Sequence, residues 1–247
     1  MKIILTGACG RMGHQVVQQA RETGHQILYG VDQKADTHEY AFPVYPDFCD
    51  PGEKADVIID FSSPALLKSE LAWAQKTSTP VLIACTGFSD NDLQLIEEAS
   101  ENIAIFRSAN LSLGIEVLKE LVRKASAMLE GYDIEIIERH HNKKADAPSG
   151  TALILLDAVK NETSEPVFGR HGADCRRKQN EIGIHSVRGG TIVGEHEVDF
   201  CGPFETISLT HTAQDRSVFA AGALRAAFFL TRQQNGCYNM ADLVRSL

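Results

Sequence analysis

The sequence predicts an α/β protein with two domains: a parallel sheet covered by helices, and a second α+β domain with a mixed, largely open sheet. Over the first 110 residues apolar strands alternate with helices, which is typical of a parallel sheet. From residue 133 onward several strands alternate apolar and polar side chains with a period of two, which indicates a sheet with one wetter face. The chain of 247 residues is long enough for two cores.

The first predicted strand, residues 1–6, runs directly into a turn with glycines at every third position, Gly7, Gly10 and Gly13. Gly7 allows a tight turn, Gly10 lets backbone N–H groups approach a pyrophosphate, and Gly13 lets the next helix pack closely on the strand. Phosphates would then lie at the N-terminus of that helix. The pattern predicts a dinucleotide site in a Rossmann-like domain.

The elements after this turn support the same prediction. A helix over 11–23 leads to a strand over 26–31, which ends at Asp32, 19 residues after Gly13. An acidic group at this distance accepts hydrogen bonds from the adenosine ribose. The alternative is a structural βαβ unit with an ordinary loop aspartate. Lys34 would either meet a 2′-phosphate or be a solvated loop lysine.

The rest of the first domain continues the alternation. An irregular stretch is expected over 38–51. We then expect strands over 57–60, 81–84 and 103–106, and helices over 64–76 and 90–100. The segments 60–64 and 85–88 follow strands, and ligands of open α/β sheets bind at such strand ends, so both are expected near the cofactor.

The second domain begins with an amphipathic helix over 115–129, which Gly131 can end. We expect strands over 133–136, 185–188, 192–200 and 207–212. A helix over 217–231 and a short tail over 239–247 then return to the first domain. The expected boundaries are 1–110 with 217–247 for dinucleotide binding, and 111–216 for the second domain.

Composition excludes several classes of protein. The net charge of −9 argues against a nucleic-acid surface, which needs clustered Lys and Arg. The six cysteines show no metal-ligand spacing and are expected to be free thiols in a reducing compartment. No apolar run has the length of a membrane span or a secretory signal, so we expect a cytoplasmic protein.

The densest group of reactive side chains is the run from His140 and His141 to Lys143 and Lys144, directly after a predicted strand. A helix starts shortly after it, at residues 148–151, with N–H donors suited to a carboxylate or phosphate. Histidine can transfer protons near neutral pH, and lysine can donate one while its charge attracts an anion. The alternative is a solvated basic turn in an acidic protein.

Two further histidines, His196 and His211, fall within alternating strands. Such residues are commonly structural or line the wall of a site. No spacing of His, Cys or Asp suggests a metal, so none is expected.

Taken together, these residues resemble the 4-hydroxy-tetrahydrodipicolinate reductase (dihydrodipicolinate reductase) family of bacterial lysine and diaminopimelate synthesis. The resemblance covers nearly the whole chain. The matching motifs are the glycine turn 7–13, Thr86-Gly87-Phe88, 110–114, 135–144, 146–152, Gly194-Glu195-His196, His211 and 223–227. The segment with His140, His141 and Lys144 followed by Asp146-Ala147-Pro148-Ser149-Gly150-Thr151-Ala152 is highly specific.

The resemblance implies roles for particular residues. His140 would be the proton donor or acceptor and Lys144 a proton donor, while His141, Gly150 and Thr151 would bind a substrate carboxylate. The implied cofactor contacts are Gly7, Ala8, Cys9, Gly10, Arg11, Met12, Asp32, Ala84, Cys85, Thr86, Ser108, Ala109, Asn110 and Leu111. The implied reaction is reduction of a cyclic imine dicarboxylate by NADH or NADPH, with domain closure bringing nicotinamide and substrate together. The family also implies a homotetramer assembled through the second sheet.

The chain departs from the family pattern at three places. Cys9 stands where glycine is usual, and Ala84-Cys85 replaces a common Gly-Thr pair, but these are backbone-contact positions. Gln33 follows Asp32 where a basic residue is frequent. Because Asp32 would repel a 2′-phosphate, the sequence favours NADH, with dual use expected.

Two rival functions stay open on the sequence. One is another NAD(P)-dependent reductase acting on a small amino or keto dicarboxylate, which would not need the His140 to Lys144 motif beside a helix start. The other is a non-catalytic redox sensor that binds the dinucleotide and typically lacks the acid/base loop.

Overall fold

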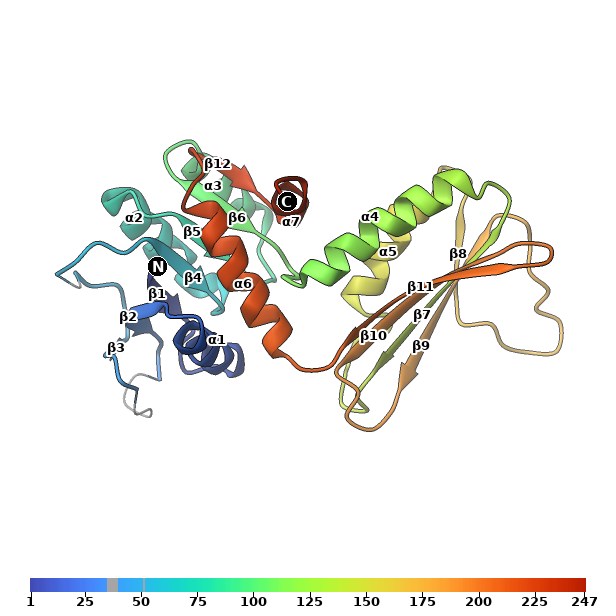
Figure 1. Ribbon diagram of the computed structural model, residues 1–247, viewed down its shortest axis with the longest axis horizontal. Helices are drawn as coiled ribbons and strands as arrows, with labels where there is room; N and C mark the ends of the chain where they lie inside the picture. Colours follow the sequence, from blue (N-terminus) through green and yellow to red (C-terminus); the bar gives the residue numbers. More distant parts are fainter. Residues whose placement is uncertain (35–39, 51) are drawn as a thin grey trace. The chain divides into compact units, whose positions relative to one another are not determined.

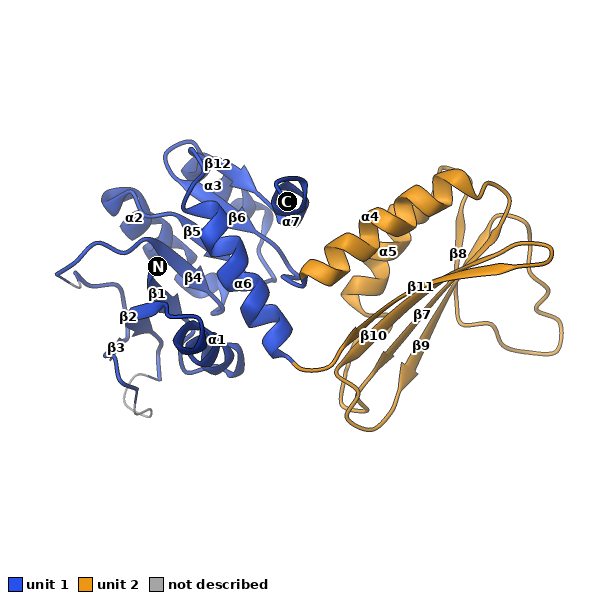
Figure 2. Cartoon of the chain, viewed as in Figure 1, with its two compact units in different colours: residues 1–112, 216–247 blue, residues 113–215 orange. Residues whose placement is uncertain are grey.

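The protein is described here from a computed structural model that places residues 1–34, 40–50 and 52–247. The chain divides into two compact units, residues 1–112 with 216–247 and residues 113–215 (Figure 2). Each unit has its own sheet and its own hydrophobic cluster. Within the placed residues, no helix combines the length and apolar character needed to cross a membrane.

The sheet of the first unit is parallel throughout. Its strands are β1 (Lys2–Thr6), β2 (Gln26–Val31), β3 (Val44–Tyr45), β4 (Val57–Asp60), β5 (Val81–Ile83), β6 (Ala104–Arg107) and β12 (Gly236–Tyr238). They lie in the order β12-β6-β5-β4-β1-β2-β3 (Figure 1). The direction of strand succession reverses between β1 and β4, and open α/β sheets bind ligands outside the carboxyl ends of strands at such a point.

Helices cover both faces of this sheet. They are α1 (Arg11–Glu22), the 3-10 helix η2 (Pro64–Leu66), α2 (Leu67–Thr77), α3 (Asp90–Ser100), α6 (Ser217–Leu230) and α7 (Met240–Arg245). Helices α1 and α6 pack together, and α6 contacts β4, β5 and β6. Leu71 of α2 and Ile96 of α3 share a buried cluster with Ile4, Ile58 and Ile83 of the sheet. Because side chains alternate along a strand, this cluster lies on one face only, and α1 with α6 covers the other.

The second unit has a mixed sheet with helices on one face (Figure 1). Its strands are β7 (Asp133–His140), β8 (Glu165–Phe168), β9 (Glu181–Arg188), β10 (Gly194–Cys201) and β11 (Thr206–Ala213), in the order β11-β10-β7-β9-β8. Strand β10 pairs antiparallel with β7 and β11, whereas β9 pairs parallel with β7 and β8. Helices α4 (Leu113–Met128) and α5 (Gly150–Val159) bury Val122 and Leu155 against Ile136, Val198 and Phe200.

The predicted α/β class and the long elements are confirmed, but three short strands were not predicted. Residues 44–45 form β3 inside the stretch expected to be irregular, so that prediction is wrong there; residues 38–39 and 51 of the same stretch lie outside the described residues. Strand β8 contains Pro166, which lacks an N–H donor and is tolerated because β8 is an edge strand. Strand β12, of three residues, lies at one edge of the parallel sheet of the first unit.

Candidate active site

Three glycines shape the turn between β1 and α1. Gly7 has a φ of +77°, and a Cβ built on it would lie 2.7 Å from the carbonyl carbon of Phe61. A Cβ on Gly13 would lie 2.3 Å from the carbonyl oxygen of Ala8, so only glycine lets α1 pack this closely. Gly10, at the N-cap of α1, brings no side chain between the helix N-terminus and a bound anion. The turn therefore fits the pyrophosphate of a dinucleotide.

Asp32 lies at the end of β2 beside this turn. One carboxylate oxygen accepts a hydrogen bond from the backbone N–H of Cys9 at 2.9 Å, and the other accepts one from the N–H of Lys34 at 2.9 Å. Tyr40, from the aromatic stretch that follows, donates its hydroxyl to the carbonyl of Ala8 at 2.9 Å. The acidic group expected to bind the ribose is thus tied to the pyrophosphate turn by one backbone hydrogen bond, from Cys9.

The turns after β4, β5 and β6 meet at the same edge of the sheet. Asp60, at the end of β4, accepts hydrogen bonds from the N–H of Ser62 at 2.7 Å and from the thiol of Cys85 at 3.0 Å. The N–H of Asn110 donates to the hydroxyl of Ser108 at 3.2 Å, which closes the turn after β6. The cofactor-binding residues predicted after these strands therefore share one edge of the sheet, as parallel strands require.

A second carboxyl group lies beneath this edge. Glu70 of α2 is buried and accepts a hydrogen bond from the hydroxyl of Thr6 at 3.0 Å. Burial, with the charge of Asp60, raises the pKa of Glu70 well above its usual range, and burial raises the pKa of Asp60 as well. Two interacting carboxyl groups in an apolar setting share a proton at pH values where exposed ones are both ionised.

In the second unit, the chemistry gathers at the end of β7. Side chains alternate along this strand, so Ile136, Glu138 and His140 are buried on the face covered by the helices. Gly194 lies beside the imidazole, where a Cβ would be 3.1 Å from Nε2 of His140. The glycine therefore leaves room for this ring.

Glu138 is fully buried and holds several donors. Its Oε2 accepts from Nδ1 of His140 at 2.6 Å and from Nη1 of Arg188 at 2.7 Å. Its Oε1 accepts from Nη2 of Arg188 at 2.6 Å and from the N–H of Ser149 at 3.1 Å. Burial alone would raise the pKa of Glu138, but the hydrogen bonds from Arg188, Ser186 and His140 outweigh it and lower the pKa to about 2.

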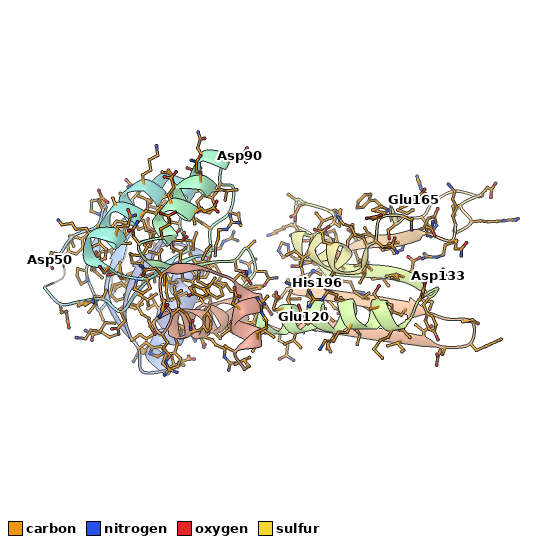
Figure 3. The ribbon with its side chains drawn as sticks, turned by 90° about the horizontal axis from the view of Figure 1, so that it is seen from above. Asp50, Asp90, Glu120, Asp133, Glu165 and His196 are labelled. Atoms are coloured by element: carbon orange, nitrogen blue, oxygen red, sulfur yellow. The ribbon has the colours of Figure 1, made fainter. Side chains whose placement is uncertain are left out.

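His196, labelled in Figure 3, lies on β10 directly opposite Glu138 and is buried on the same side of the sheet. Its ring contacts that of His140 edge to face at 5.1 Å, and its Nε2 lies 2.9 Å from the hydroxyl of Ser149. Burial, then the charge of His140, lowers the pKa of His196 to about 4, and burial also lowers the pKa of His140 although Glu138 opposes it. Across the described chain, no group of three His, Cys, Asp or Glu side chains is arranged to hold a metal.

The loop after β7 carries the cationic group. Nζ of Lys144 pairs with Oδ1 of Asp146 at 2.8 Å, and its charge reaches His140, whose pKa it helps to lower. Nδ1 of His141 is buried with no hydrogen-bond partner among the described residues. Helix α5 begins at Gly150, capped by the hydroxyl of Ser149. A buried histidine, an ammonium group and a helix N-terminus therefore lie together in one unit.

Sequence reasoning singled out His140, His141, Lys144 and the helix start, and it left His196 as either a structural histidine or a residue of the site wall. It missed Glu138 and Arg188. Glu138 carried a usable signal, because it precedes His140 by two residues in a strand and so must share its face. Arg188 carried none, since it lies 50 residues from Glu138 along the chain.

Comparison with known proteins gives a consistent result. Two family models match, "Dihydrodipicolinate reductase, N-terminus" over residues 1–111 and "Dihydrodipicolinate reductase, C-terminus" over 114–244. The 4-hydroxy-tetrahydrodipicolinate reductases of Caldanaerobacter subterraneus and Clostridium botulinum are 51% and 46% identical, each covering 99% of this chain and 98% of the relative. The structure of dipicolinate-bound dihydrodipicolinate reductase from Paenisporosarcina sp. superposes with a TM-score of 0.79 at 21% identity, covering 97% of both chains.

Proposed function

The chain belongs to the dihydrodipicolinate reductase family, and from that premise we propose how its residues carry out the reaction. The function is NAD(P)H-dependent reduction of 4-hydroxy-tetrahydrodipicolinate to tetrahydrodipicolinate in lysine and diaminopimelate biosynthesis. The protein is thus an oxidoreductase with a Rossmann-like domain.

The cofactor is held by the first unit. The turn from Gly7 to Met12 would hold its pyrophosphate and Asp32 its ribose, and the turns 84–86 and 108–111 would contact the rest of the cofactor. When bound, NADH or NADPH supplies the hydride. The Asp32 carboxylate accepts a hydrogen bond from the N–H of Cys9, at the position expected for the adenosine ribose. Its negative charge would repel the 2′-phosphate of NADPH, so NADH is favoured, although both cofactors are used.

The substrate is held by the second unit. The substrate is a dicarboxylate, and His141, Gly150 and Thr151 bind one carboxylate at the N-terminus of α5, where N–H groups and the helix dipole favour an anion. Lys144 donates the proton that the reduced ring requires, and His140 takes part as the acid/base histidine. The charge of Lys144 also stabilises the negative charge that develops on the substrate.

One observation carries this proposal: the imidazole of His140 is buried and held by Glu138, in the same unit as Lys144 and the capped start of α5. A solvated basic turn would not bury its histidine against a carboxylate. The arrangement supports catalysis over a sensor role, since a sensor needs no acid/base group.

The coupled reaction tests the proposal. Purified protein is combined with dihydrodipicolinate synthase, pyruvate and aspartate semialdehyde, and loss of NADH or NADPH absorbance is followed. We expect oxidation that depends on the synthase and falls by at least about 10²-fold in His140→Ala and Lys144→Ala. Lys143→Ala is the matched control, because Lys143 is an exposed neighbour in the same loop and should retain activity.

Retained activity in His140→Ala and Lys144→Ala would contradict the assigned roles. Absence of oxidation by folded wild-type protein that binds NADH would contradict the reductase function itself and favour the sensor. The ratio of rates with the two cofactors measures the NADH preference.

Assembly and location belong to the same proposal. The protein forms a homotetramer through the face of the second sheet opposite α4 and α5, which carries the exposed Val187. It works in the reducing cytoplasm, in keeping with six cysteines that are all free thiols.

A further inference from the structure

The buried carboxylate of Glu138 connects three parts of the substrate unit. It contacts the acid/base histidine through Nδ1 of His140, and the start of α5 through the N–H of Ser149. Arg188, which binds Glu138 through two nitrogens, also donates to the carbonyl of Asp146 at 2.7 Å. Asp146 in turn pairs with Lys144. This ion pair therefore contacts His140 and the start of α5 directly and reaches Lys144 through Asp146.

Arg188 determines whether the carboxyl group of Glu138 is ionised or neutral. A carboxyl group this deeply buried would be neutral if it were alone, and a neutral carboxylic acid can donate a proton as well as accept one. The fork of Arg188 supplies two charge-assisted hydrogen bonds that keep Glu138 ionised. An ionised carboxylate only accepts, so the hydrogen between Glu138 and His140 belongs to Nδ1.

This assignment leaves Nε2 of His140 as the reactive nitrogen. In a neutral imidazole with Nδ1–H, Nε2 carries the lone pair. Nε2 is the atom nearest to Gly194, where the missing side chain keeps space beside it. The groups that act on the ring are Glu138 from β7, Arg188 from β9, His196 from β10 and Lys144 from the loop. Two of these, Lys144 and Arg188, are cations and disfavour a second proton on His140.

We propose that Glu138 and Arg188 are positioning residues that fix the Nδ1–H form and the orientation of His140. His140 then presents the lone pair of Nε2 to the substrate as a hydrogen-bond acceptor, while Lys144 donates the one proton that the reduced ring takes up. This inference rests on the proposed function, and it resolves the donor-or-acceptor ambiguity of His140. It assigns neither residue a contact with substrate.

The first test reads the tautomer directly. Histidine labelled with ¹⁵N in the wild-type protein should show His140 neutral at pH 7 with the hydrogen on Nδ1. In Glu138→Gln, whose amide can donate to the ring, the hydrogen should move to Nε2 in a substantial fraction of molecules. Wild-type His140 protonated on Nε2 alone, or on both nitrogens, would overturn the inference, and this measurement requires neither turnover nor a variant that folds.

The second test reads the reaction. We expect kcat to fall by about 10- to 100-fold in Glu138→Gln, with the Kd for NADH unchanged, as is usual when a partner that orients a functional histidine is lost. Glu138→Asp, which keeps the charge, should recover part of kcat, and Arg188→Lys should lie between wild type and Glu138→Gln. If Glu138 had only a structural role, its loss would lower the fraction of folded protein. Restoring the carboxylate charge in Glu138→Asp would then not restore kcat.

Glu120→Gln is the matched control. Glu120 of α4 pairs with Arg123, as Glu138 pairs with Arg188, but it lies outside the site and outside the proposed tetramer face, and its loss should leave kcat and the His140 tautomer unchanged. Wild-type kcat in folded Glu138→Gln would overturn the inference. If wild-type protein shows no reductase activity, the proposed function fails, while the tautomer result still decides whether Glu138 fixes the ring.

Discussion

His196 shows how burial can determine a protonation state in this protein. Its pKa of about 4 in the folded chain compares with 6.5 for an ordinary histidine, because its ring is buried between β10 and the start of α5. Between these two pH values the unfolded chain binds a proton that the folded chain does not. The contribution of neutral His196 to the free energy of unfolding is therefore complete above pH 6.5 and is lost as the pH falls towards 4. The shift corresponds to about 3 kcal/mol.

Replacing His196 with glutamine, which has no charge at any pH, should remove this dependence. Between pH 7 and pH 4 we expect the free energy of unfolding of the wild type to fall by about 3 kcal/mol more than that of the variant. Urea unfolding at several pH values measures the difference. The carboxyl pair Asp60 and Glu70 titrates alike in both proteins, so its contribution cancels. Parallel pH profiles would show that His196 is not held neutral.

Among the elements, helix α1 depends on one small residue for its place beside β1. Gly13 lets the helix approach β1 so closely that a Cβ would lie 2.3 Å from one backbone carbonyl oxygen and 2.4 Å from another. Backbone cannot yield as a flexible side chain can, so the helix must shift. The N-terminus of α1 would move with it, and the phosphate site depends on that N-terminus.

We therefore expect Gly13→Ala to weaken NADH binding by at least about 10-fold and to destabilise the first unit by about 1–3 kcal/mol. Fluorescence titration with NADH and thermal unfolding measure both effects. Gln18→Ala, at an exposed position on the same helix, is the control and should change neither appreciably. If Gly13→Ala binds NADH as tightly as the control does, the close approach of α1 is not what shapes the site.

For the whole molecule, the face of the second sheet opposite its helices accounts for the proposed tetramer. Val187 is 44% exposed on this face, and Arg139 beside it pairs with Glu195 and Glu197. Apolar and paired charged side chains that are partly exposed in one chain are the kind that a second copy can cover.

We expect Val187→Glu to convert tetramers into smaller species, because it places an unpaired charge in the proposed interface. Sedimentation velocity measures the mass of the assembly. The control is Leu153→Glu, at an exposed position on α5 on the other side of the sheet, which should leave the assembly intact. A wild-type protein that sediments as a monomer would contradict the proposed tetramer.

The sequence by itself determined the parallel sheet, the glycine turn, Asp32 and the group of His140, Lys144 and the α5 start. These depend on periodicity and on spacing within a few residues, which short-range sterics and hydrogen bonding dictate. It did not determine the edge strands β3, β8 and β12, which are too short to show a period and form because a neighbouring strand offers its backbone groups.

Only the tertiary structure brought Arg188 to Glu138. Strand β9 pairs with β7 in a register that places Arg188 opposite His140, and no local pattern encodes that register. The pKa values of the site follow from the same pairing, since burial and partner charge exist only after the chain has folded. The residue types of the candidate site are thus readable from the sequence, whereas their protonation states depend on contacts between segments far apart in it.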